Sequence, residues 1–124
     1  TGYREIFGER SQQAAATSIT LARSRLKLGD PKEADDLVRI YAEDETIQLP
    51  NSMRLVAMKT HGRALAALED LPGGMIWLAK SYELSIKMGD EKEAKDIAAK
   101  LVDIALKAGD NQSAEKWTQV ANAK

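Results

Sequence analysis

Apolar residues recur at the spacing of an α-helix along most of this chain. Ile19, Ala22 and Leu26 lie three and four residues apart, and a similar spacing returns at Leu101 and Ile104. That spacing places side chains on one face of a helix, whereas a half-buried strand would alternate at every second residue. Short polar segments with glycine or proline separate the apolar stretches. The pattern predicts an all-α protein with helices at residues 12–28, 31–45, 51–68, 73–88, 91–108 and 111–123.

The segments between the predicted helices combine a signal that ends one helix with a signal that begins the next. Glycine adopts the left-handed conformation that often closes a helix, and a following aspartate can cap the next helix. Three such pairs occur, Gly29-Asp30, Gly89-Asp90 and Gly109-Asp110. Pro31 suits the first position of a helix. Glu33 and Glu93 follow their caps by three residues, as in a capping box. Residues 46–49 form the most loop-like stretch after the N-terminus.

A shift of the sequence by 40 residues aligns three segments without an insertion, and it superimposes Trp77 on Trp117. Short side chains coincide at two further positions, which hold Ala22, Gly62 and Val102, and Ala34, Gly74 and Ala114. The period predicts three helix pairs, at residues 12–50, 51–90 and 91–124. Residues 1–11 would then be an N-terminal segment that corresponds to the end of a preceding helix.

These repeated features resemble the tetratricopeptide repeat, in which small residues let the two helices of a unit pack closely. The resemblance rests on Leu21-Ala22, His61-Gly62 and the recurring turns, and it covers residues 12–124. The unit of 40 residues is similar to the longer variety found in kinesin light chains, polarity adaptors and sensor regions of bacterial transcription regulators. The aromatic residues usual in that family are absent, with Ser18 and Val38 in their places in the first unit. The family implies a short right-handed α-solenoid that binds proteins or peptides.

Alternatives stay open for both the fold and the function. A HEAT-like array also has units of about 40 residues, but the compact Gly-Asp turns and the paired small positions favour the tetratricopeptide interpretation. Within that fold, the chain is alternatively the sensor or regulatory segment of a bacterial transcription regulator. A second alternative is RNA binding by helical repeats, whose units are usually shorter.

The composition excludes several classes of partner and of structure. Of 124 residues, 44% are apolar but only 5% are aromatic, so small aliphatic side chains must supply most of the packing. The 18 Lys and Arg residues and 19 Asp and Glu residues leave a net charge of -1, without the basic excess that drives binding to phosphate backbones. We therefore expect no nucleic-acid partner. Cysteine is absent and no apolar run could span a bilayer, so we expect no disulfide, no membrane partner and a cytoplasmic location.

No residue pattern predicts catalysis, a metal site or a bound cofactor. His61 is the only histidine, and we expect it to pack in its helix pair with satisfied hydrogen bonds. The carboxylates at residues 35–36 and 43–45 diverge around a helix, so we interpret them as solvated charge. Pro72-Gly73-Gly74 lacks the strand and the lysine of a phosphate loop, so we expect it to serve packing. The chain is therefore expected not to be an enzyme.

The family resemblance implies that exposed positions of the first helices line a concave groove. Arg23 and Arg63 share one register of the repeat, so they would form a basic strip that turns acidic toward Asp103. Such a strip suits an acidic segment or a C-terminal carboxylate of a protein or peptide partner. The predicted groove residues are Ile19, Arg23, Lys27, Lys59, Arg63, Asp103 and Lys107. The alternative is an ordinary charged surface, and the asparagines of the chaperone-type carboxylate clamp are absent.

Both ends of the predicted array carry apolar residues. Trp117 and Val120 lie on the last helix, where no further unit follows to cover them, so we interpret them as an end interface. Tyr3, Ile6 and Phe7 occupy the place of a preceding second helix. These residues predict self-association through the terminal repeats, or a longer array. Because the first residue is not methionine, we expect the chain to be one region of a larger protein.

Overall fold

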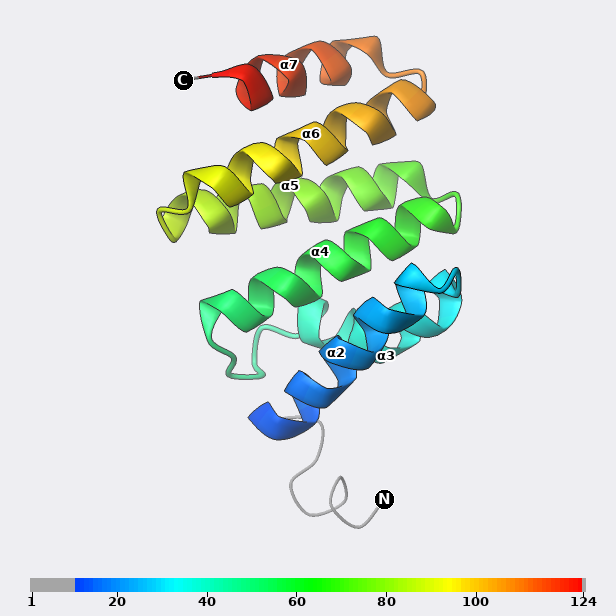
Figure 1. Cartoon of the computed structure of the whole chain (residues 1–124), viewed down its shortest axis with the longest axis vertical. Helices are drawn as coiled ribbons and strands as arrows, with labels where there is room; N and C mark the ends of the chain where they lie inside the picture. Colours follow the sequence, from blue (N-terminus) through cyan, green and yellow to red (C-terminus); the bar gives the residue numbers. More distant parts are fainter. Residues whose placement is uncertain (1–10, 124) are drawn as a thin grey trace.

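A computed structural model describes residues 11–123 of the chain. Within this range the fold is all-α, with no β-strand. The helices are α2 (Gln12–Lys27), α3 (Pro31–Glu43), α4 (Asn51–Ala67), α5 (Leu71–Lys87), α6 (Glu91–Lys107) and α7 (Asn111–Asn122). They stack in chain order along the longest axis of the molecule, and each helix packs against the next (Figure 1). None of them has the length and apolar character that crossing a membrane requires.

The predicted helix boundaries agree with the structure to within two residues. The largest error at a helix start is at α5, which we expected to begin at residue 73 but which begins at Leu71. Asp70 causes the earlier start, because its Oδ1 accepts a hydrogen bond from the backbone N–H of Gly73 at 3.0 Å. Asp70 is therefore the N-cap, and Pro72 lies in the first turn, where the helix does not need its missing N–H.

Every turn between consecutive helices, except the longer connection between α3 and α4, contains a left-handed residue, and at three of these four turns it is the glycine that the sequence predicts. Gly29, Gly89 and Gly109 have φ angles of +87°, +76° and +73°. At the equivalent place between α4 and α5, Glu69 has a φ angle of 71°. This conformation is unfavourable for any residue with a Cβ atom. The chain therefore keeps the same turn geometry even where it lacks the glycine.

The expected capping boxes form only in part. Asp30 Oδ1 accepts a hydrogen bond from the N–H of Glu33 at 3.3 Å, and Asp90 Oδ1 accepts one from Glu93 at 3.1 Å. The N–H groups of both aspartates donate to carbonyl oxygens of the preceding helix at 2.9 Å, so these N–H groups already have acceptors and do not bond to the glutamate side chains. The Glu93 carboxylate lies instead 2.5 Å from Lys59 Nζ. The other hydrogen bond of a capping box, from the N–H of the aspartate to the glutamate side chain, is therefore not formed, and this part of the prediction is wrong.

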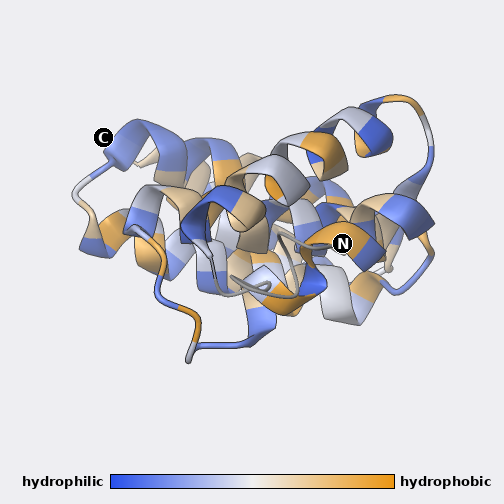
Figure 2. Ribbon diagram, turned by 90° about the horizontal axis from the view of Figure 1, so that it is seen from below, coloured by the Kyte–Doolittle hydropathy of each residue, from blue (hydrophilic) through white to orange (hydrophobic). Residues whose placement is uncertain are grey.

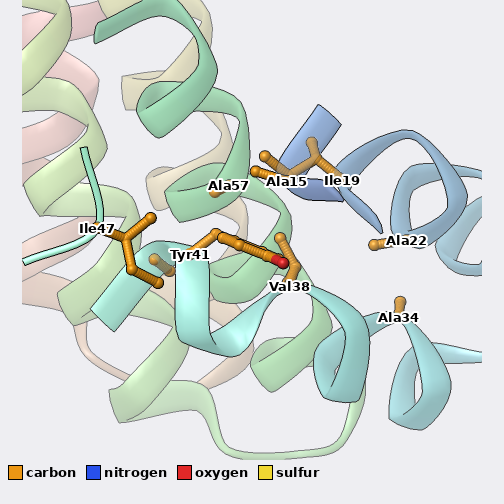
Figure 3. Packing of buried hydrophobic residues seen from close by; sticks show 9 residues of the cluster. Ala15, Ile19, Ala22, Ala34, Val38, Tyr41, Ile47 and Ala57 are labelled. Carbon is orange, nitrogen blue, oxygen red and sulfur yellow. The ribbon is translucent and has the colours of Figure 1, made fainter. Parts of the chain in front are cut away.

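Among the described residues, the core consists of two clusters of buried side chains. The first lies between α2, α3 and α4, where Val38, Tyr41 and Ile47 are at most 1% exposed (Figure 3). The second lies among the later helices around Leu78 and Leu101, both fully buried. Apolar and polar residues are interspersed along the helices (Figure 2). Each helix therefore buries its apolar stripe against its neighbours in the stack.

Small residues lie where paired helices touch, as predicted. Ala22 of α2 faces Ala34 of α3, and both are fully buried (Figure 3). Between α4 and α5, a Cβ atom on Gly62 would lie 3.1 Å from Leu78 Cγ, a contact tighter than most real Cβ atoms make. Ala114 is 5% exposed on α7. The close approach of the helices depends on these short side chains.

Arg54 of α4 holds the connection between α3 and α4. Its Nη1 donates hydrogen bonds to the carbonyl oxygens of Tyr41 at 2.5 Å and Asp44 at 3.1 Å, and its Nη2 donates to that of Ile47. These acceptors include carbonyl groups at the end of α3, which have no partner inside the helix. The helix ends at Glu43, two residues before the predicted end, and residues 46–49 form the predicted loop.

Candidate binding groove

Two neighbouring hollows open along α2, α4 and α6. The first has a volume of about 370 Å³ and lies between α2 and α4. It is lined by Thr20, Arg23, Ser24, Leu26, Lys27, Thr60 and Arg63. The second has a volume of about 440 Å³ and is lined by Arg63, Ala66, Ala67, Lys100, Asp103, Ile104 and Lys107. Because Arg63 lines both hollows, we describe them together as the groove.

Five of the predicted groove residues line these hollows. Arg23, Lys27 and Arg63 line the first hollow, and Asp103 and Lys107 join Arg63 in the second. The arginine register of the first and second predicted units therefore does place two guanidinium groups beside one cavity.

Two predicted groove residues lie elsewhere. Ile19 is only 4% exposed and belongs to the first core cluster, because it shares one helical face with Ala15 and Ala22. Its assignment to the groove is wrong. Lys59 lines neither hollow, and its Nζ lies 2.5 Å from Glu93 Oε1, with only 21% of the lysine side chain exposed. This ion pair joins α4 to the start of α6.

The sequence interpretation missed several lining residues that a stricter use of the repeat would have found. The hollows use positions separated by three, four and seven residues, which is one stripe of a helix. One such position is shared by Thr20, Thr60 and Lys100, which are 40 residues apart. It lies three residues before the register of Arg23. The 40-residue period could therefore have predicted these lining residues, if it had also been applied to the position one helical turn before the arginines.

The first hollow carries uncompensated positive charge. Arg23, Lys27 and Arg63 are exposed, and none of them has a carboxylate within ion-pair distance among residues 11–123. No acidic side chain of the described part of the chain lines this hollow. The second hollow differs, because Asp103 accompanies its cations and two alanines and Ile104 supply apolar surface. The groove therefore has a cationic half and a mixed half.

A buried polar network links α3 to α4 behind the groove helices. His61 is 1% exposed, and its Nδ1 contacts Asp35 Oδ1 while its Nε2 lies 2.9 Å from Glu43 Oε2. The second oxygen of Asp35 lies 2.5 Å from Arg39 Nη2. The expected packing of His61 with satisfied hydrogen bonds is confirmed. The interpretation of Asp35 as solvated charge is wrong, because this carboxylate is fully buried.

The electrostatics of the network favour an ionised Asp35. Burial alone would raise the pKa of this carboxyl, but hydrogen bonds from His61 and Arg39 outweigh burial and hold its pKa below the ordinary value. A carboxylate can only accept hydrogen bonds, so the ring nitrogen facing it donates. No group of His, Asp and Glu side chains within residues 11–123 is arranged to hold a metal ion. We interpret the network as a link between two helices.

The C-terminal end differs from its prediction. Trp117 is only 8% exposed, because its ring packs edge-on against Tyr82 of α5, with centroids 5.1 Å apart. The expectation that Trp117 offers exposed aromatic surface is therefore wrong. Val120 is half-buried and borders a hollow of about 230 Å³ shared by α5, α6 and α7. The predicted N-terminal contact residues, Tyr3, Ile6 and Phe7, lie outside the described residues.

The segment Pro72-Gly73-Gly74 packs as expected. A Cβ atom on Gly74 would lie 2.9 Å from the Cβ atom of Ala66, so this glycine sits against α4. Trp77, three residues later, is half-buried against the first core cluster, and its ring centroid lies 4.9 Å from that of His61.

Comparison of the chain with known protein families, curated proteins and solved structures found no match.

Proposed function

We propose that this chain is a non-catalytic protein-binding module of the tetratricopeptide type, with three helix pairs in a short right-handed solenoid. Its ligand is an acidic segment of a partner protein that lies in the groove along α2, α4 and α6. One observation carries the proposal, namely that Arg23, Lys27 and Arg63 border one hollow and have no carboxylate partner within residues 11–123.

The charge distribution supports a polypeptide ligand. The chain as a whole is nearly neutral, so three unpaired cations around one hollow are a local feature. Cations that line a concave surface attract acidic ligands and accelerate their association. Guanidinium groups then form charge-assisted hydrogen bonds with carboxylates, which are stronger than bonds between neutral groups. The apolar part of the second hollow, formed by Ala66, Ala67 and Ile104, offers a place for an apolar side chain of the same segment.

The test measures binding of short labelled peptides by fluorescence anisotropy. One pool contains glutamate and leucine at random positions, and the matched pool contains lysine and leucine. The acidic pool is expected to bind, and affinity should fall as salt is added, because the contacts are ionic. Equal binding of the two pools, or no binding of either, would show that the groove does not select acidic segments.

Charge reversal of the groove gives the matched control. The double variant Arg23→Glu/Arg63→Glu should retain the helical circular dichroism signal but lose binding of the acidic pool. The variant Lys87→Glu/Lys92→Glu changes the net charge by the same amount at exposed lysines that line neither hollow. It should bind like the unmodified protein. Equal loss in both double variants would assign the effect to net charge and not to the groove.

A further inference from the structure

We propose that the first hollow of the groove is a receptor for a phosphoryl group, carried by a phosphorylated serine or threonine of the partner segment. This inference rests on the proposed function, because it assigns the chemistry of one residue within the bound segment. It draws on the charge of the hollow, the hydroxyl groups around it and the apolar surface beside it.

The charge of the hollow exceeds what one carboxylate would neutralise. Two arginines and one lysine line it, and none of the acidic residues that the structure describes does. A glutamate side chain of the ligand carries one negative charge. A phosphoserine carries a charge of about -1.5 to -2 at neutral pH, together with three strong acceptor oxygens. Two guanidinium forks and an ammonium group can serve these oxygens together, as guanidinium groups bind phosphate in a bidentate manner.

Hydroxyl groups supply further donors at the same hollow. Thr20, Ser24 and Thr60 line it beside the cations. Thr60 is only 4% exposed, and its side chain makes no hydrogen bond with another residue of the described part of the chain. A hydroxyl without an internal partner can donate to an oxygen of a ligand. The hollow therefore combines positive charge with neutral donors and offers no competing carboxylate.

The second hollow determines which kind of residue can lie next to the phosphorylated residue of the ligand. Arg63 belongs to both hollows, so a chain whose phosphoryl group contacts Arg63 must continue over the second one or leave the groove. Apolar surface from Ala66, Ala67 and Ile104 lies there. An apolar side chain close to the phosphorylated residue would bury this surface. The expected ligand is thus a phosphorylated serine or threonine with an apolar residue nearby.

A protein ligand fits this surface better than RNA. Proteins that bind single-stranded nucleic acids usually stack bases on aromatic side chains. None of the residues that line either hollow is aromatic. One phosphoryl group followed by apolar surface is the arrangement of a phosphopeptide.

The experiment uses three labelled peptide pools that differ only at a fixed central residue, which is phosphoserine, glutamate or serine. The flanking positions contain leucine, glutamate and serine at random. The phosphoserine pool is expected to bind at least about tenfold more tightly than the glutamate pool, a difference that two added charge-assisted contacts can supply. The variant Arg23→Lys/Arg63→Lys keeps the charge but removes the guanidinium forks. It should lose most of the preference for phosphoserine while its affinity for the glutamate pool changes little.

The outcomes separate this inference from the proposed function. Equal affinity for the phosphoserine and glutamate pools, with binding still abolished by Arg23→Glu/Arg63→Glu, would overturn the phosphoryl assignment and leave the proposed function standing. Failure of all pools to bind would overturn both. A uridine oligonucleotide that binds more tightly than the phosphoserine pool would assign the hollow to nucleic-acid phosphate and would also overturn the inference. Lys87→Glu/Lys92→Glu again serves as the control, with the phosphoserine preference expected to persist.

Discussion

Gly62 and Gly74 bring the backbones of α4 and α5 into direct contact at the centre of the stack. A Cβ atom on Gly62 would lie 3.2 Å from the carbonyl oxygen of Gly74, and one on Gly74 would lie 2.9 Å from the carbonyl oxygen of Gly62. Each glycine thus occupies the space that a side chain on the other helix would need. Because both carbonyl oxygens belong to the backbone, no change of rotamer could move them away from an added side chain.

Enlarging either glycine should therefore separate the two helices. We expect Gly62→Leu and Gly74→Leu each to lower the free energy of unfolding by about 1–3 kcal/mol, as overpacked sites do. Ala34→Leu should lose a similar amount, because Ala34 is fully buried. Ala67 is exposed on the groove, so Ala67→Leu should change stability by less than about 0.5 kcal/mol. Urea denaturation followed by circular dichroism measures these differences, and similar midpoints for all variants would contradict the close contact.

The left-handed turn at Glu69 offers a stabilising substitution. Glu69 has a φ angle of 71°. Glycine adopts this conformation freely, whereas an L-residue is destabilised by about 1–2 kcal/mol. Glu69→Gly is expected to raise the free energy of unfolding by about 1 kcal/mol, and Gly109→Ala, at a φ angle of +73°, to lower it by a similar amount. Thermal unfolding should show shifts of opposite sign, and a drop in the midpoint for Glu69→Gly would contradict this assignment.

Arg54 should contribute strongly to stability although it lies outside the apolar core. Its guanidinium donates to three carbonyl oxygens, and hydrogen bonds to charged groups contribute about 1.5–3 kcal/mol each. Arg54→Met keeps much of the side-chain volume but leaves these acceptors without their donor. We expect a loss of at least about 2 kcal/mol, together with faster amide hydrogen exchange in residues 44–50. Arg63→Met at the exposed groove is the control, with little change expected in either measurement.

Asp35 should make stability depend on pH in acid. Its pKa in the folded protein lies below the ordinary value near 3.9 that it has in the unfolded chain. The ionised form therefore stabilises the fold above about pH 4, and this contribution is lost as the pH falls through the folded pKa. The groups that face Asp35 are His61 from α4 and Arg39 from α3, and Glu43 contacts the other nitrogen of His61.

The comparison of Asp35→Asn with the unmodified protein tests this dependence. At neutral pH the variant should be less stable by about 3 kcal/mol, because it leaves a buried histidine and an arginine without their shared partner. The difference should shrink below about pH 4, where the native carboxyl also becomes neutral. Asp96→Asn changes an exposed carboxylate and should show neither effect. A difference between the two proteins that stays constant from neutral to strongly acidic pH would contradict the role of the charge.

Local signals along the chain determined the helices and their turns. Gly29 and Asp30 act through hydrogen bonds to residues three to five positions away, and such short-range bonds can be predicted from neighbouring residues. The 40-residue period likewise placed Arg23 and Arg63 beside one hollow. It did so because equivalent positions of packed helices face the same side. The same reasoning placed small residues at the contact of Ala22 with Ala34.

Only the tertiary structure decided which polar groups are buried. Asp35 and His61 are 26 residues apart, and nothing in the local pattern distinguishes Asp35 from its exposed neighbour Asp36. Trp117 is covered by Tyr82 because of the way α5 and α7 pack around α6, which the spacing of residues along one helix does not reveal. Pairings of this kind depend on the angle and rotation of one helix against another. These are set by the fit of whole helix faces, so a one-dimensional period gives the register of a position but not the environment of its side chain.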